Sequence, residues 1–176
     1  GGVTYEGYHL CAALAGLRSG VVPQQGLTNV EIAGFDDLSR TVDLFNQSQL
    51  NTMAEEGIWI VTQINPVTTR HALTTAGFGD VLTQEEQVTS NVDSMSYLFL
   101  RRVEDLIGKT NVTPGTMDIV RSRLSTTIDF FKEVRIPRLG GQLNDGRILE
   151  LRQHTLLKDR IVANLELTVP VPLNNL

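Results

Sequence analysis

The sequence has little of the chemistry that would tie it to a disulfide scaffold, a membrane or nucleic acid. Among its 176 residues there is one cysteine, Cys11, so no disulfide can form within the chain. No apolar run approaches the roughly 20 residues that a membrane-spanning helix needs. Lysine and arginine number 15 against 20 aspartate and glutamate residues, and the formal charge of -5 gives no overall attraction for a phosphate backbone. These absences argue against nucleic acid and membranes as direct partners.

What the chain does contain is the composition of an ordinary globular domain. Apolar residues make up 41% and charged residues 20%, which is close to the globular average. The length suits one domain with a core of its own, so residues 1–176 are predicted to form a single domain. The chain begins Gly1-Gly2-Val3 without a methionine, and we therefore expect it to be part of a longer polypeptide.

Two long amphipathic helices are the strongest structural signals. Glu85-Glu86 begins the first helix and Gly108 ends it. Thr113, followed by proline, is a favourable cap for the second, which continues to about Arg135. Apolar residues recur every three or four positions along both, at Val88, Val92, Met95, Phe99, Val103 and Leu106, and then at Met117, Val120, Leu124, Ile128, Phe131 and Val134.

Shorter elements are predicted on either side of these helices. Helices are expected over Tyr5–Arg18 and Ser39–Gln49, strands over Asn29–Phe35, Leu50–Ala54 and Ile58–Ile64, and a loop or extended segment over Pro66–Thr83. Near the C-terminus, Leu149 and Leu151 alternate with polar residues, and a second alternating run follows from Ile161 to Val169. The predicted fold class is α/β (α+β-like). It has a mixed β-sheet flanked by two long amphipathic helices, shorter helices, and a C-terminal β-hairpin.

The residue patterns of catalytic, cofactor and metal sites are missing. Gly77-Phe78-Gly79 lacks the third glycine of a dinucleotide-binding turn, and the three histidines have no zinc-ligand spacing. The basic pairs Arg101-Arg102 and Arg121/Arg123 fall on predicted helix faces that also carry acids. Solvated ion pairs, or contacts with a neighbouring subunit, therefore explain them better than nucleic-acid binding. We assign no catalytic, cofactor-binding or metal residue.

The C-terminal run is the best candidate for a contact between subunits. It is prone to form a strand near the end of the chain, and such a strand can pair with another subunit by strand addition. An ordinary edge strand within the domain is the alternative. The candidate residues are Ile161, Ala163, Leu165, Leu167, Val169, Val171 and Leu173.

The order of several segments resembles the contractile phage tail sheath proteins. The Ala/Gly-rich stretch Gly7–Leu17 and the proline-containing stretch Val22–Thr28 are similar to a helix and loop of that family. The further segments that carry the resemblance are Leu44–Asn51, Gly57–Ile60, Arg70–Thr75, Val92–Ser94, Ile107–Thr113 and Val169–Leu173. Together they cover nearly the whole chain, in order.

The resemblance implies a structural virion protein without an active site or cofactor. Sheath subunits form hexameric rings, stacked helically around a tail tube, and their terminal arms add strands to neighbouring subunits. The chain would then be the conserved C-terminal part of a larger sheath protein, with terminal arms and outer domains missing. The implied partners are other copies, the tail tube protein, and the baseplate and tail terminator proteins. The implied location is the virion tail, assembled in the host cytoplasm.

Three other functions are also consistent with the sequence. The protein could be a non-contractile sheath-like protein of a tail appendage or stub. It could be a small α/β enzyme whose site is assembled from distant residues such as Cys11, His71 and Asp80. It could also be a monomeric ligand-binding module.

Overall fold

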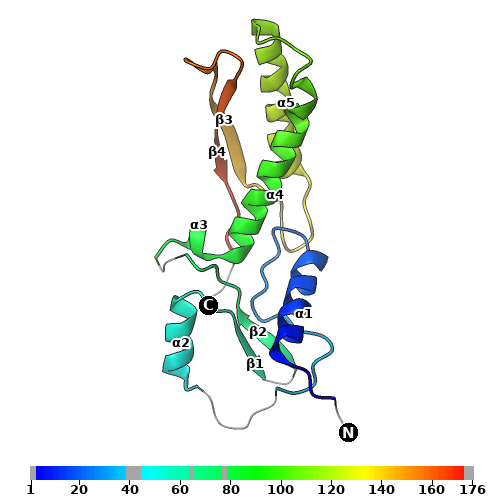
Figure 1. The fold of residues 1–176 in the computed structure, drawn as a ribbon, viewed down its shortest axis with the longest axis vertical. Helices are drawn as coiled ribbons and strands as arrows, with labels where there is room; N and C mark the ends of the chain where they lie inside the picture. Colours follow the sequence, from blue (N-terminus) through cyan, green and yellow to red (C-terminus); the bar gives the residue numbers. More distant parts are fainter. Residues whose placement is uncertain (1–2, 39–44, 64–65, 77–78, 173–176) are drawn as a thin grey trace. The chain divides into compact units, whose positions relative to one another are not determined.

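The computed structural model of the chain describes residues 3–38, 45–63, 66–76 and 79–172, and it divides the chain into two compact units. The first unit comprises residues 1–89 and 171–176, and the second comprises residues 90–170. The elements in chain order are α1 (Gly7–Gly20), α2 (Gln47–Glu55), β1 (Ile60–Gln63), β2 (Val67–His71), α3 (Val81–Gln84), α4 (Glu86–Val103), the 3-10 helix η1 (Glu104–Leu106), α5 (Pro114–Glu133), β3 (Asp145–Gln153) and β4 (Ile161–Thr168) (Figure 1).

The predicted fold class is confirmed, including the two long helices and the C-terminal hairpin. Among the described residues the strands form two separate antiparallel pairs, β1–β2 and β3–β4. None of the helices in the described ranges is long and apolar enough to cross a membrane.

The first unit is built around the β1–β2 pair. Residues near Glu31 extend this pair on the β2 side, because the Ile32 amide donates to the Val67 carbonyl and the Thr69 amide donates to the Val30 carbonyl. The strand predicted over Asn29–Phe35 is therefore reduced to a single bridge. The buried apolar residues of the first unit include Leu27, Ile32 and Val67.

The strand predicted over Leu50–Ala54 is wrong, because these residues belong to helix α2. A reciprocal cap begins this helix, since the Asn46 side chain accepts from the Gln49 amide and the Gln49 side chain accepts from the Asn46 amide. The cap satisfies two amides that a helix start leaves free, which outweighs the weak strand pattern. The predicted helix Ser39–Gln49 lies partly outside the described residues. The predicted loop over Pro66–Thr83 contains β2 and the short helix α3.

Helix α1 has no buried residue, and polar contacts of Arg18 join it to the following loop and to Glu86. The Arg18 guanidinium donates to the carbonyls of Pro23 and Gln25, at 2.8 and 2.9 Å, and forms an ion pair with Glu86 at 3.0 Å. Burial of Glu86 raises the pKa of its carboxyl, and the Arg18 charge opposes that rise.

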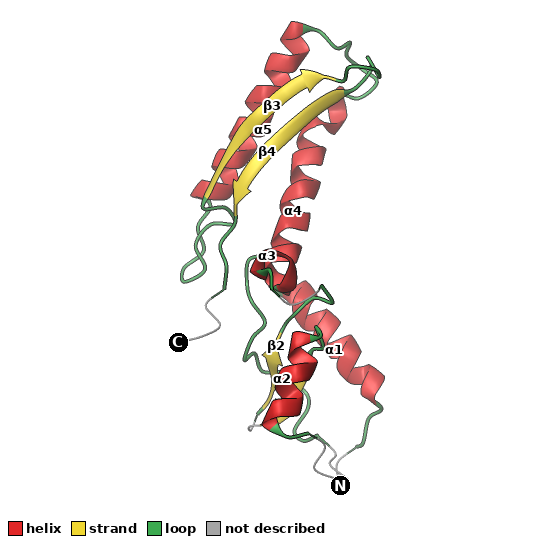
Figure 2. Cartoon of the chain, turned by 90° about the vertical axis from the view of Figure 1, so that its left-hand side faces the viewer, coloured by secondary structure: helices red, strands yellow, loops and turns green. Residues whose placement is uncertain are grey.

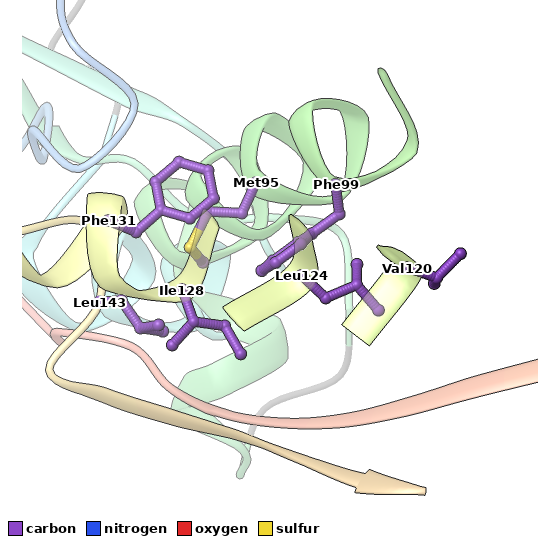
Figure 3. Packing of buried hydrophobic residues seen from close by; sticks show 7 residues of the cluster. All are labelled: Met95, Phe99, Val120, Leu124, Ile128, Phe131 and Leu143. Atoms are coloured by element: carbon purple, nitrogen blue, oxygen red, sulfur yellow. The ribbon is translucent and has the colours of Figure 1, made fainter. Parts of the chain in front are cut away.

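The second unit has a core in which α4 and α5 pack together beneath the hairpin (Figures 2 and 3). Its buried members are Met95, Phe99, Val120, Leu124, Ile128, Phe131 and Leu143. The rings of Phe99 and Phe131 meet edge to face, with centroids 5.6 Å apart. Thr113 caps α5 as predicted, since its hydroxyl accepts from the Thr116 amide.

A bulge changes which hairpin residues face this core. Ile148 lies opposite Leu165 and Glu150 opposite Asn164, which leaves Leu149 without a partner in β4. Ile148 and Leu151 pack against the core, whereas Leu149 is 59% exposed. The predicted alternation, which placed Leu149 and Leu151 on one side, is wrong because the extra residue shifts the register.

Gly141→Ala should destabilise the second unit. A β-carbon at Gly141 would lie 2.8 Å from the Phe131 carbonyl oxygen and 3.1 Å from that of Lys132, and both are backbone atoms that cannot turn away. We expect a loss of about 1–3 kcal/mol in the free energy of unfolding, measured by denaturant titration. The matched control is Gly115→Ala in α5, where the nearest atom lies 3.9 Å away and the change should be neutral or stabilising.

Glu86→Gln should change how stability depends on pH. Because the folded-state pKa of Glu86 is raised above its ordinary value of 4.5, this group favours folding below pH 4.5 and loses that contribution as pH rises through the folded pKa. Denaturant unfolding at several pH values should show wild type losing stability relative to Glu86→Gln across that window. A constant difference between the two proteins would contradict the assigned shift.

Candidate assembly surfaces

The structure places the predicted pairing residues of the C-terminal run mostly on the inner side of the hairpin. Ile161, Leu165, Leu167 and Val169 pack against the helical core. Their side chains hold the hairpin to its own helices. Val171, in the first unit, is 48% exposed. Leu173 lies outside the described residues.

The outer face of the hairpin is polar and internally paired. Arg147 forms an ion pair with Glu166, and Arg152 pairs with Glu150 at 2.7 Å. Asn164 also donates to Glu150 at 2.8 Å. A face whose charges already have partners offers little to an apolar docking surface.

The backbone edge of β4 is a different kind of surface. Among the described strands β4 pairs only with β3, so one row of its amides and carbonyls has no strand beside it. β4 runs without a bulge or proline from Ile161 to Thr168, and it lacks lysine, a residue that often protects strand edges. This edge could accept a further strand through main-chain hydrogen bonds.

An apolar groove of about 510 Å³ opens beside the start of β4. Ile161 and Ala163 line it from β4, and α4, η1, α5 and the loop between the helices supply most of the rest. Leu100 and Ile107 in its lining are 57% and 69% exposed. Ala163 lies on the core-facing side of β4 and is nevertheless exposed, because the groove leaves it uncovered.

A second concavity, between α4 and α5, has a basic lining. Its volume is about 420 Å³, and Arg101, Arg102 and Arg123 line it together with Phe130 and three hydroxyl residues, Ser122, Thr126 and Thr127. No carboxylate is among these lining residues. We call it the arginine pocket.

Two of the three guanidinium groups of the arginine pocket have acidic partners at its margin. Arg101 pairs with Glu104 at 3.0 Å, and Arg123 pairs with Asp105. The hydrogen bond from Arg123 lowers the pKa of the Asp105 carboxyl. The Arg102 side chain is exposed and makes no ion pair or hydrogen bond within the described chain.

The residues considered for an enzyme have separate local roles. Asp80 caps α3 by accepting from the Leu82 amide at 3.0 Å, and Cys11 is exposed on α1. His71 lies on β2, opposite Ile60. No hydrogen bond or ion pair joins these three, and the described residues contain no group of three or more histidine, cysteine or acidic side chains that could hold a metal ion.

Comparisons of the sequence find no matching family model and no matching curated protein. Comparison of the fold finds clear matches among solved structures. A chain in the cryo-EM structure of the anti-feeding prophage baseplate, 6-fold symmetrised, superposes with a TM-score of 0.71 at 11% sequence identity. A chain in the cryo-EM structure of the anti-feeding prophage helical sheath in its contracted state superposes with a TM-score of 0.67 at 10% identity.

Each match covers 95% of this chain and 47% of the other chain. The protein therefore spans about half the length of the chains it resembles. At these identities the matches establish a shared fold, the fold of components found in a contractile sheath and its baseplate.

Leu165→Asp should disrupt the second unit. Leu165 packs against the buried cluster, so the substitution would place a carboxylate against apolar side chains. We expect a loss of at least about 2–3 kcal/mol in the free energy of unfolding, or insoluble protein. Leu149→Asp is the matched control, because Leu149 is 59% exposed and should tolerate the same substitution. Equal behaviour of the two variants would contradict the inward orientation of Leu165.

Proposed function

We propose that the protein is a structural virion protein, a tail sheath subunit that polymerises around a tail tube and supports contraction during genome delivery. The observation that carries this proposal is the fold match over 95% of the chain to a chain of a contracted helical sheath. The ordered sequence resemblance to the same class of protein supports the same proposal.

In this proposal residues 1–176 are the conserved part of a larger sheath protein, with terminal arms and outer domains missing. The 47% coverage of the matched chains is consistent with that arrangement. The protein would act without catalysis or a cofactor, in the virion tail after assembly in the host cytoplasm. Its partners would be other copies in hexameric rings, the tail tube protein, and the baseplate and tail terminator proteins.

The contact between copies is proposed to include strand addition at the hairpin. The free edge of β4 supplies main-chain donors and acceptors. The adjoining apolar groove can receive alternate side chains of an added strand, as strand-addition sites generally do. The inward side chains of Ile161, Leu165, Leu167 and Val169 would support that edge from below, and Val171 and Leu173 would continue the segment.

A second candidate is a non-contractile sheath-like protein of a tail appendage or stub. The higher TM-score, 0.71, belongs to the match in a baseplate structure, which favours keeping this alternative. The two candidates differ in where the protein lies along the tail.

Electron microscopy separates these functions. If the protein is a sheath subunit, the full-length protein should assemble into rings or tubes. Antibodies against it should label virion tails along their whole length. Labelling confined to one end of the tail would favour the appendage or stub. No rings or tubes under any assembly condition, together with absence of the protein from virions, would refute both.

A further inference from the structure

The two units carry very different charge, although the whole chain is only mildly acidic. The first unit contains 10 acidic and 3 basic side chains, a formal charge of -7. The second contains 10 acidic and 12 basic side chains, a formal charge of +2. Such asymmetry makes one unit clearly negative and the other slightly positive, and units of opposite sign attract when they belong to different copies.

The ion pairs follow the same division. Five salt bridges between described residues lie in the second unit, and the Arg18–Glu86 salt bridge lies in the first. Glu55 and Glu56 are exposed carboxylates of the first unit, and neither makes an ion pair with another described residue.

Glu55 and Glu56 also stand where carboxylates are unfavourable. They form the C-terminal end of α2, which has no basic residue in its last turn. A helix C-terminus carries partial negative charge, so carboxylates there reduce helix stability. A cation from outside the unit would relieve this unfavourable charge.

The arginine pocket is complementary to this acidic helix end. Its polar lining consists of guanidinium and hydroxyl groups. The Thr126 and Thr127 hydroxyls donate to the Ser122 and Arg123 carbonyls of their own helix. The Arg102 guanidinium, which makes no ion pair or hydrogen bond among the described residues, is therefore the donor left for an outside anion. Guanidinium groups bind carboxylates with charge-assisted hydrogen bonds. The pocket lies entirely in the second unit, and the acidic helix end lies entirely in the first.

We propose that the arginine pocket of one copy binds the Glu55–Glu56 end of α2 from a second copy. The contact joins two different surfaces of the chain, so each copy can both give and receive it, and its repetition can build a ring or a helical filament. It rests on the proposed self-assembly of the chain, and it adds an electrostatic contact that is separate from strand addition at β4.

Sedimentation of the full chain over a range of concentrations and salt tests the contact. Wild type should self-associate, and the association should weaken as salt rises from about 0.05 M to about 0.5 M, because exposed charges are screened. Arg102→Glu should weaken self-association about tenfold at low salt. Arg135→Glu makes the same change of charge at an exposed arginine of the same unit outside the pocket, and it should leave the association unchanged.

The acidic partner is tested by Glu55→Lys combined with Glu56→Lys. This double variant moves the formal charge from -5 to -1, which by itself would favour association. Our proposal predicts the opposite effect, namely that self-association weakens about tenfold. Asp36→Lys with Asp37→Lys is the control, since it reverses an adjacent exposed pair in the same unit. Arg102→Glu added to the Glu55→Lys/Glu56→Lys variant should restore part of the lost association.

Unchanged melting curves would show that each variant still folds. The contact is overturned if wild type stays monomeric, if Arg102→Glu and Arg135→Glu have equal effects, or if Glu55→Lys/Glu56→Lys associates as well as wild type. In that last case the pocket would bind another partner. Salt-sensitive association without rings or tubes in the microscope would support this contact and count against the sheath function. If the Arg102→Glu variant still forms tubes, that result would support the sheath function and count against this contact.

Discussion

The apolar contact between α4 and α5 is the interaction on which the second unit depends. Met95 and Phe99 from α4 meet Leu124, Ile128 and Phe131 from α5, and all five side chains are buried. Full burial of side chains of this size contributes roughly 1.5–3 kcal/mol each. A lone two-stranded hairpin is marginally stable in water, so β3 and β4 need this core beneath them. The core therefore makes possible a strand edge that is both open and firmly supported.

That arrangement leaves several surfaces of the second unit open to other chains. The outer hairpin face is neutralised by its own ion pairs, whereas the β4 edge, the apolar groove and the arginine pocket remain available. These three surfaces offer different chemistry, namely main-chain hydrogen bonds, apolar burial and charge. Under the proposed sheath function, a subunit held by separable contacts of this kind would break one contact while it keeps another.

The net charge of the chain hides a large difference in charge between its two units. A net charge of -5 excludes little more than nonspecific binding to nucleic acid. Divided between the units it becomes -7 and +2, and the division depends on where the chain folds into separate bodies. The search for active-site motifs could not reveal this property, because it belongs to surfaces and not to spacing along the chain.

The sequence by itself determined the elements whose signals are local. The apolar repeat from Val88 to Leu106 and the Thr113 cap placed the two long helices, because helix periodicity and capping depend on neighbouring residues. The sequence also identified the C-terminal alternation of the hairpin. It misplaced α2 as a strand, although the Asn46–Gln49 cap was a signal that could have found it.

Only the tertiary structure decided which sides of these elements are covered. The bulge at Leu149 shifts the register of β3, and such a shift depends on the pairing strand and the core beneath it. The inward orientation of the C-terminal run, the exposure of Ala163 beside a groove and the gathering of three arginines in one pocket all join residues distant in sequence. Long-range packing determines such juxtapositions, and no local pattern in the chain encodes them.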